Sequence, residues 1–227
     1  MSRIFAISDV HGCGISFDHL ISKEIKLKKS DELFLLGDYI DRGKNSKQVI
    51  DIILDLISKG YKVNCLRGNH EQMFMDTKND EMRYMQWKAI FGGNATLSSF
   101  NVDHYDELEE RYKLFFEGLS YYFESNKNIF VHAGLNFSNE NIFDDLHYML
   151  WSRDMKINAA LLDNRKVIHG HTPRRLDDLQ NQISDKENNY SFNIDTGCAY
   201  KKEMGYGNLT AIELTKMVLF FTKNLDR

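Results

Sequence analysis

Short islands of acidic, histidine and glycine residues, spread over most of the chain, contain the side chains that could do chemistry. Each island comes just after an apolar run, where a strand would end. Their carboxylate oxygens, imidazole nitrogens and amide oxygen are donors of a mixed metal shell. Two ions in such a shell can clamp a phosphoryl group and hydrolyse a phosphate ester. The islands are Asp9-Val10-His11-Gly12, Gly37-Asp38-Tyr39-Ile40-Asp41-Arg42-Gly43, Gly68-Asn69-His70-Glu71, His132-Ala133-Gly134 and Gly170-His171.

Six of these residues are the predicted metal ligands. Asp9 and His11 stand two residues apart beyond a strand end, so one extended segment can present both to a single ion. Asp38 follows Gly37, which lets the backbone turn tightly beside the ions. No set of cysteines accompanies them, so a closed zinc site is not expected, and manganese, iron or zinc all suit the donors. The full ligand set is Asp9, His11, Asp38, Asn69, His132 and His171.

The catalytic acid and the phosphate-binding cations are predicted from the same islands and from one later arginine. His70 lies next to Asn69, near the metals without being forced to bind them, and is expected to protonate the leaving oxygen. Asp41 is expected to orient His70 and to keep it protonated. Because guanidinium groups match phosphate oxygens in pairs, the candidates for phosphate binding are Arg42, Arg67 and Arg153, although Arg153 by itself is equally well explained as a surface arginine. His169 is left as a strand-end residue.

Each of these residues alone has an ordinary structural explanation. Acidic residues cap loops, Gly-Asn-His is a common turn sequence, and a lone histidine after a strand is more often a packing residue. Such explanations would have to hold at six positions that all follow predicted strands. We therefore favour the functional interpretation.

The first third of the chain alternates predicted strands and helices, which explains how distant islands could meet. Strands are expected at residues 3–8, 32–36 and 62–66, and helices at residues 15–27 and from Asn45 or Ser46 to Gly60. This order predicts a parallel sheet with right-handed crossovers, in which ligands collect beyond the carboxyl ends of the strands. Asp9, Asp38 and Asn69 stand two or three residues past such ends and should converge on one edge.

The rest of the chain is expected to complete a mixed α/β fold. Residues 71–117 are predicted to be mostly helical; they could form a lid that holds substrate, but we favour helices that cover the sheet with their own small core. A hairpin is expected at 121–123 and 129–131, with further strands at 167–168, 192–194, 209–212 and 218–221. The whole chain, residues 1–227, is predicted to be one domain with two mixed sheets packed as a sandwich flanked by helices.

Composition excludes several classes of protein. The net charge of −4 provides no basic field, so nucleic acid is not an expected partner. No apolar run approaches the ~18 residues of a membrane span, and the opening run is too short for a signal peptide, so a cytoplasmic protein without a membrane partner is expected. Three cysteines without a CxxC pair argue against a disulfide framework. The oligomeric state stays open.

The ordered set of islands resembles the PPP-type metallophosphoesterases, and among them the small bacterial and bacteriophage lambda serine/threonine protein phosphatases. The matching strings extend from residue 9 to residue 210, nearly the whole chain. They are Asp9-Val-His-Gly, Gly37-Asp-Tyr-Ile-Asp-Arg-Gly, Leu66-Arg-Gly-Asn-His-Glu, His132-Ala-Gly, Trp151-Ser-Arg, Gly170-His-Thr-Pro, Asp195-Thr-Gly and Gly207-Asn-Leu-Thr.

This resemblance implies a calcineurin-like fold and a two-metal centre. It places Asp9, His11 and His171 on one ion, Asn69 and His132 on the other, and Asp38 between them. His70 with Asp41 would be the general acid, and Arg42, Arg67 and Arg153 the phosphate clamp. The bacterial relatives are typically activated by manganese and hydrolyse phosphoproteins or phosphopeptides by direct attack of a metal-bridging hydroxide.

Two alternatives to a serine/threonine phosphatase remain. The symmetrical diadenosine tetraphosphatases are also similar, but generally have Ala in place of Asp41 and Asp in place of Glu71; in that alternative, aromatic residues of 71–117 could stack on adenine. A binding scaffold without catalysis is disfavoured, because no ligand and no proton donor is missing. Ala133 and the segment 195–200 depart from the eukaryotic enzymes, so no regulatory subunits or inhibitor sensitivity are inferred. Phosphotyrosine stays open as a substrate.

Overall fold

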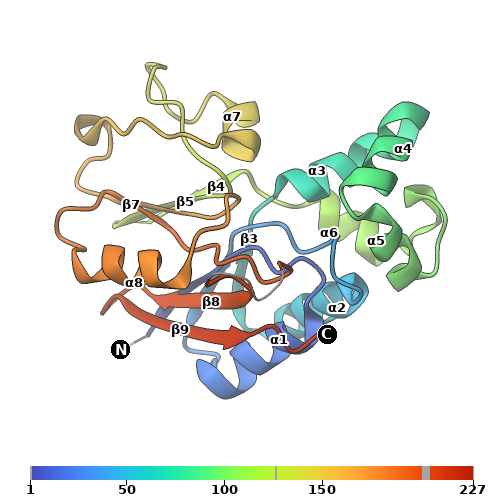
Figure 1. The fold of residues 1–227 in the computed structure, drawn as a ribbon, viewed down its shortest axis with the longest axis horizontal. Coiled ribbons are helices and arrows are strands. Elements are labelled where there is room, and N and C mark those ends of the chain that lie inside the picture. Colours follow the sequence, from blue (N-terminus) through green and yellow to red (C-terminus); the bar gives the residue numbers. More distant parts are fainter. Residues whose placement is uncertain (1, 126, 201–204, 227) are drawn as a thin grey trace.

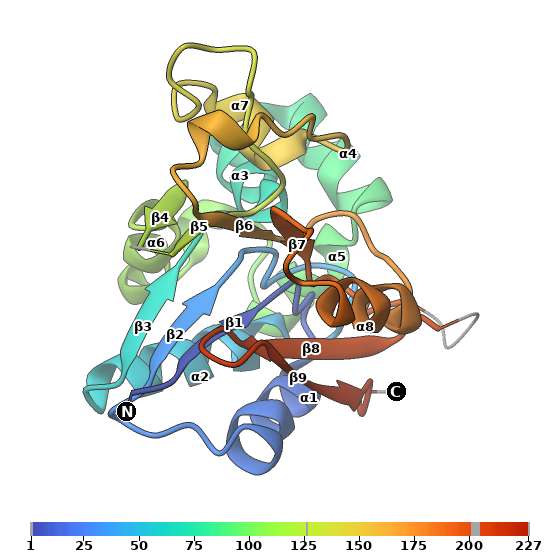
Figure 2. The ribbon, with the colours of Figure 1, turned by 90° about the vertical axis from the view of Figure 1, so that its left-hand side faces the viewer.

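Two mixed β-sheets pack face to face with helices outside them in this computed structural model, which describes residues 2–125, 127–200 and 205–226 (Figures 1 and 2). The first sheet has the strand order β3-β2-β1-β8-β9. Strands β1, β2 and β3 run parallel to one another, β8 runs antiparallel to β1, and β9 runs antiparallel to β8. The predicted sandwich is confirmed. The strands of this sheet are β1 (Ile4–Ile7), β2 (Glu32–Leu35), β3 (Lys62–Cys65), β8 (Asn208–Glu213) and β9 (Val218–Lys223).

The second sheet has the strand order β4-β5-β6-β7. More of its neighbouring strands run parallel than the sequence pattern suggested. Its strands are β4 (Tyr122–Glu124), β5 (Asn128–Val131), β6 (Lys166–His169) and β7 (Ser191–Asn193). The expected β4–β5 hairpin is present, but β5, β6 and β7 run parallel to one another. Parallel neighbours need long crossovers. Two unforeseen helices, α7 (Leu146–Trp151) and α8 (Leu176–Ser184), lie in those crossovers.

The two predicted N-terminal helices cover the outer face of the first sheet (Figure 2). The first is shorter than expected: α1 (Gly14–His19) continues into a π-helical turn, Leu20–Glu24, and ends there. The second, α2 (Ser46–Ser58), buries Val49, Ile50 and Ile53 as its apolar spacing predicted. Gly60 follows it with φ +80°, a left-handed conformation that suits a residue without Cβ.

The region between residues 69 and 117 is helical, as predicted, and has an aromatic core. Phe74 stacks on Trp87 with ring centroids 4.7 Å apart, and the edges of Tyr105 and Phe116 pack around it. This core is continuous with the one beneath β1 and β2. The helices are α3 (Asn69–Asp76), α4 (Glu81–Ile90), α5 (Gly93–Phe100) and α6 (Glu110–Glu117), with 3₁₀ turns at Thr77–Asn79, Tyr105–Glu107 and, elsewhere, Ala159–Leu161.

The segment after β9 ties the end of the described chain to the first helix (Figure 1). The Asp226 carboxylate accepts hydrogen bonds from the backbone N–H groups of Ile15 and Ser16, each at 2.9 Å, and from the side chain of Asn45 at 2.8 Å. Asp226 thus joins the start of α1, which follows the Asp9–His11 island, to the start of α2, which follows the Asp38–Arg42 island. No helix among the described residues is long and apolar enough to cross a membrane.

The contact between the two sheets depends on a pair of stacked rings. Phe34 of β2 lies face to face on Phe130 of β5, with centroids 3.7 Å apart and planes inclined by 3°. Phe34 is 4% exposed and Phe130 is fully buried. Phe34 pairs in register with Ala6 of β1. Ala6, Ile168 and Phe192 share the core between the sheets with the two rings.

We expect Phe34→Ala to lower the free energy of unfolding by about 3–5 kcal/mol, the usual cost of truncating a buried phenylalanine. Denaturant titration followed by circular dichroism measures the loss. Phe221→Ala on β9 is the control, because Phe221 is 39% exposed and should change stability by about 0.5 kcal/mol or less. Equal losses in both variants would contradict the assigned packing.

Candidate metal centre and active site

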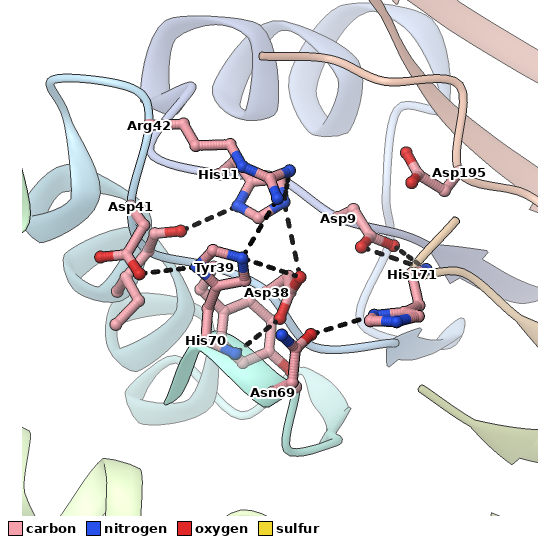
Figure 3. A network of polar contacts seen from close by, with 12 residues as sticks. Asp9, His11, Asp38, Tyr39, Asp41, Arg42, Asn69, His70, His171 and Asp195 are labelled. Atoms are coloured by element: carbon pink, nitrogen blue, oxygen red, sulfur yellow. Dashed lines mark hydrogen bonds and ion pairs between the residues drawn. The ribbon is translucent and has the colours of Figure 1, made fainter. Parts of the chain in front are cut away.

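The site lies where the carboxyl ends of strands from both sheets meet, as the pattern of islands predicted. Asp9 follows β1, Asp38 follows β2 and Asn69 begins α3 after β3. His132 and His171 come from the ends of β5 and β6 in the second sheet. The His171 N–H donates to both carboxylate oxygens of Asp9, at 3.2 and 3.1 Å, and the His70 N–H donates to Asp38 Oδ1 at 3.1 Å (Figure 3).

The backbone of the site is strained at the residues that point into it. Non-glycine residues rarely adopt positive φ, and such conformations cluster at functional sites. Among the described residues, eleven non-glycine positions have positive φ, and six of them are predicted site residues. These are Asp9 (25°), His11 (45°), Asp38 (53°), Asp41 (71°), Arg42 (66°) and His171 (73°). The strain turns each loop sharply at the strand end.

Two glycines of the islands allow backbone to lie directly against the carboxylates. A Cβ at Gly170 would collide with Asp9 Oδ2 and with the Ser8 hydroxyl, and one at Gly68 would collide with Asp38 Oδ1. Any side chain at these positions would therefore displace a predicted ligand. This close approach explains why glycine precedes His171 and Asn69 in the sequence.

Two histidines of the site present nitrogen lone pairs to a carboxylate. His11 Nδ1 faces the carbonyl of Ile40 at 3.0 Å, and His132 Nδ1 faces the carbonyl of Leu36 at 2.8 Å. Because a carbonyl only accepts, each Nδ1 must donate, and each Nε2 is left with its lone pair. These Nε2 atoms lie 3.4 and 3.5 Å from Asp38 oxygens. Lone pairs that face carboxylate oxygens suit a cation between them, and His11 Nε2 in addition accepts a hydrogen bond from Arg42 at 2.6 Å.

The donor atoms form two groups that share Asp38. One group is His11, Asp38 and His70; the other is Asp38, His132 and His171. Asn69 Oδ1 belongs with the second, since it lies 3.0 Å from both His132 Nε2 and His171 Nδ1. The expected division of the ligands between the two ions is therefore corrected for His171, which lies with His132 and Asn69 instead of with His11. Asp9 meets His171 only at its main-chain nitrogen.

The electrostatics of the site fit bound cations. Burial raises the pKa of the Asp9 carboxyl to about 6, and the charge of Asp38 adds to this effect. Burial also raises the pKa of Asp195 well above its usual range, with Asp9 as a further cause. Burial and the neighbouring His132 lower the pKa of His171 to about 3, which leaves a neutral imidazole. Buried carboxylates beside neutral imidazoles are the ligand states that divalent ions require.

Glu71 fastens the Asp38 loop, a role that the sequence analysis missed. Its buried carboxylate accepts hydrogen bonds from the backbone N–H groups of Gly68 (3.0 Å), Asp38 (2.9 Å) and Tyr39 (2.8 Å). Burial raises the pKa of Glu71 to about 7. Asp195, named earlier only within a matched string, also lies at the site (Figure 3). The signal for Glu71 was its place directly after Asn69-His70, at the start of a helix.

His70 and Asp41 form the pair expected for a proton donor. His70 Nδ1 lies 2.6 Å from Asp41 Oδ2, and both side chains are buried. Burial disfavours the charged imidazole, but the charge of Asp38 and the bond to Asp41 outweigh it and raise the pKa of His70. Because Asp41 accepts at Nδ1, the Nε2 atom of His70 is the one directed toward Asp38 and Arg42, at 3.9 and 3.2 Å.

The three predicted phosphate-binding arginines are placed differently. Arg42 lies over the metal ligands, with its guanidinium 2.6 Å from His11 Nε2. Arg153 is exposed, and its charge contributes to the lowered pKa of His171. Arg67 donates to Gln72 and Tyr121 and to the carbonyl of Glu117, away from the metal ligands. Phosphate binding by all three stays a prediction, and Arg42 is the best placed for it.

The grouping of the donor atoms agrees with leaving His169 out of the site. It belongs to neither donor group, and its Nδ1 has no hydrogen-bond partner among the described residues.

Residues 2–203 match the model of the calcineurin-like phosphoesterases. The chain belongs to this family. It is 27% identical over 188 residues to serine/threonine-protein phosphatase 1 of Salmonella typhimurium, which covers 77% of this chain and 82% of that protein. It is 32% identical over 108 residues to a symmetrical bis(5'-nucleosyl)-tetraphosphatase of Buchnera aphidicola, covering 46% of this chain and 35% of that protein.

A solved structure of a putative diadenosine tetraphosphatase shares the fold, with a TM-score of 0.71 at 15% identity, covering 100% of this chain and 95% of that one. Family and donor cluster together identify a metal-dependent phosphoesterase with a binuclear centre. Two matched activities, on phosphoproteins and on dinucleotides, leave its substrate to be argued from the site.

We expect Asp38→Asn to lose metal and activity together, because both donor groups share this carboxylate. Metal content by mass spectrometry and turnover of p-nitrophenyl phosphate measure the two losses. Asp178→Asn, an exposed change on α8, is the control and should retain both. A folded Asp38→Asn protein that still held two ions would contradict the assignment.

Proposed function

We propose that this chain is a serine/threonine protein phosphatase that hydrolyses phosphomonoesters of phosphoproteins with two divalent ions, manganese first and iron or zinc as alternatives. The observation that carries the proposal is the buried His70–Asp41 pair, 2.6 Å between Nδ1 and Oδ2. The pair stands beside the shared ligand Asp38, to which His70 also donates through its backbone.

The basicity of the leaving group links the His70–Asp41 pair to the class of substrate. Hydrolysis of phosphoserine or phosphothreonine releases an alkoxide, a strong base that must be protonated as the bond to phosphorus breaks. A tyrosine phenolate, with a pKa of ~10, needs the proton less. A nucleotide released from a phosphoanhydride is a weaker base still. A buried acid pair in which Asp41 holds His70 therefore favours alkyl phosphomonoesters as substrates.

The other residues of the site have roles that follow from their placement. His11, Asp38, Asn69, His132 and His171, with Asp9, would hold the ions, which when bound neutralise phosphate charge and lower the pKa of bound water. Arg42 is positioned to bind the nonbridging phosphate oxygens, with Arg153 at the edge of the site. His70 Nε2 would deliver the proton to the leaving oxygen.

The relatives support the same proposal without deciding it. The match to the Salmonella typhimurium phosphatase extends over 82% of that protein, whereas the match to the Buchnera aphidicola tetraphosphatase extends over 35% of it. The phosphatase match thus extends over most of both proteins.

A second candidate, hydrolysis of diadenosine tetraphosphate, is favoured by a cavity beside the acid pair. This cavity of about 290 Å³ is lined by aromatic side chains, among them Trp87, Phe91 and Trp151. The Phe91 ring lies 6.2 Å from the His70 ring, centroid to centroid. Aromatic walls of this kind can stack on adenine.

We expect manganese-reloaded protein, stripped beforehand with a chelator, to dephosphorylate a phosphothreonine peptide faster than it hydrolyses diadenosine tetraphosphate. Initial rates on both substrates, with a phosphotyrosine peptide in parallel, test this directly. Turnover of the dinucleotide alone would overturn the proposal and favour the second candidate. In that event Phe91→Ala should weaken nucleotide turnover.

We expect His70→Asn to keep both ions but to slow turnover of the phosphothreonine peptide by about 10²–10⁴-fold, the range for general acid catalysis. The loss should be much smaller with p-nitrophenyl phosphate, whose leaving group is a weak base. The ratio of the two losses is the measurement. A variant that kept full activity on the peptide would refute the acid assignment.

A further inference from the structure

The carboxylate of Asp41 is held by two side chains that the proposed mechanism does not use. Trp87 Nε1 donates to Asp41 Oδ2 at 2.7 Å, the same oxygen that accepts from His70. Thr96 donates its hydroxyl to Asp41 Oδ1 at 2.6 Å. The Asp41 backbone N–H donates back to Thr96 Oγ1 at 2.9 Å. Trp87 belongs to α4 and Thr96 to α5, so both come from the helical region.

The turn between α4 and α5 is built for this contact. A Cβ at Gly93 would lie 2.5 Å from the indole ring of Trp87, and one at Gly92 would lie 2.5 Å from the backbone nitrogen of Arg42. Gly92 also has φ +94°, which other residues rarely adopt. The two glycines therefore let the indole and the Asp41–Arg42 loop approach the same turn.

The indole has little freedom to leave the carboxylate. Its ring stacks on Phe74 with centroids 4.7 Å apart and planes inclined by 17°, and Trp87 is 1% exposed. Asp41 and Thr96 are fully buried. A buried carboxylate with fixed donors on both oxygens cannot rotate about its own axis, because rotation would break short charge-assisted hydrogen bonds without water to replace them.

We propose that Trp87 and Thr96 are positioning residues for the general acid: they fix the rotation of the Asp41 carboxylate, and through it the ring of His70. The helical region is then part of the catalytic apparatus and does more than cover the sheet. This inference rests on the proposed function, because it acts through His70 as the proton donor. Neither residue touches the substrate in this role.

The test compares Trp87→Phe and Thr96→Val with matched controls. Tyr84→Phe removes two hydrogen bonds, to the Asp103 carbonyl at 3.0 Å and from Lys88 at 2.9 Å, from a buried aromatic residue of the same helix α4. Thr96→Ser keeps the hydroxyl and should rescue the loss seen in Thr96→Val. All variants are reloaded with manganese and checked for two bound ions and for cooperative thermal unfolding.

We expect Trp87→Phe and Thr96→Val each to lower kcat on the phosphothreonine peptide by about 10- to 100-fold, the equivalent of one hydrogen bond to a charged group. The loss on p-nitrophenyl phosphate should be a few-fold at most, and KM should change little. Tyr84→Phe should keep the same ratio of rates on the two substrates as the unaltered protein. Equal losses on both substrates would overturn the inference.

A double-mutant cycle of Trp87→Phe and His70→Asn separates a positioning role of Trp87 from general structural damage. If Trp87 acts only through His70, Trp87→Phe should have no further effect on kcat in the His70→Asn background. Losses that multiply would overturn the inference while leaving His70 as the acid. If His70→Asn itself shows no dependence on the leaving group, the proposed function fails instead. Should Trp87→Phe not fold, Thr96→Val with Thr96→Ser carries the test with the same outcomes.

Discussion

The structure depends on one buried carboxylate, Asp38, which both groups of candidate metal ligands share. Asp38 lies beyond β2, 2% exposed, with nitrogen lone pairs of His11 and His132 aimed at its two oxygens. Such a cluster is unfavourable unless positive charge compensates it. The sharp loops, the close glycines and the Glu71 carboxylate all hold Asp38 in this position. Much of the local backbone strain therefore serves a site whose favourable state includes metal ions.

The carboxylate of Asp41 follows the opposite logic, because both of its oxygens are satisfied within the protein. Asp41 receives hydrogen bonds from His70, Trp87 and Thr96, all buried. A buried network with every partner present is rigid, and rigidity is what a proton donor needs beside a breaking bond. The predicted metal ligands are thus arranged to bind something absent from the polypeptide, whereas the partners of the Asp41 carboxylate all come from the protein.

The proposed substrate class rests on this acid pair. The family accommodates several phosphate esters, and the aromatic cavity beside His70 could receive either a peptide side chain or a base. Under the proposed function the acid pair distinguishes them, because an alkoxide needs a proton and a nucleotide leaving group scarcely does. A chain selected only to cleave phosphoanhydrides would have little reason to bury three donors on Asp41.

The sequence by itself determined the family, the sandwich of mixed sheets and the convergence of Asp9, Asp38 and Asn69, because residues at the carboxyl ends of neighbouring parallel strands must meet. It missed the parallel order of β5, β6 and β7 and the helix α8, since short strands carry no sign of their partner's direction. Only the tertiary structure decided that His171 lies with His132, that Glu71 fastens the Asp38 loop and that Trp87 and Thr96 hold Asp41. Those contacts join residues that are remote in sequence or face one another across packed elements, and side-chain direction there is set by packing, which periodicity and spacing do not encode.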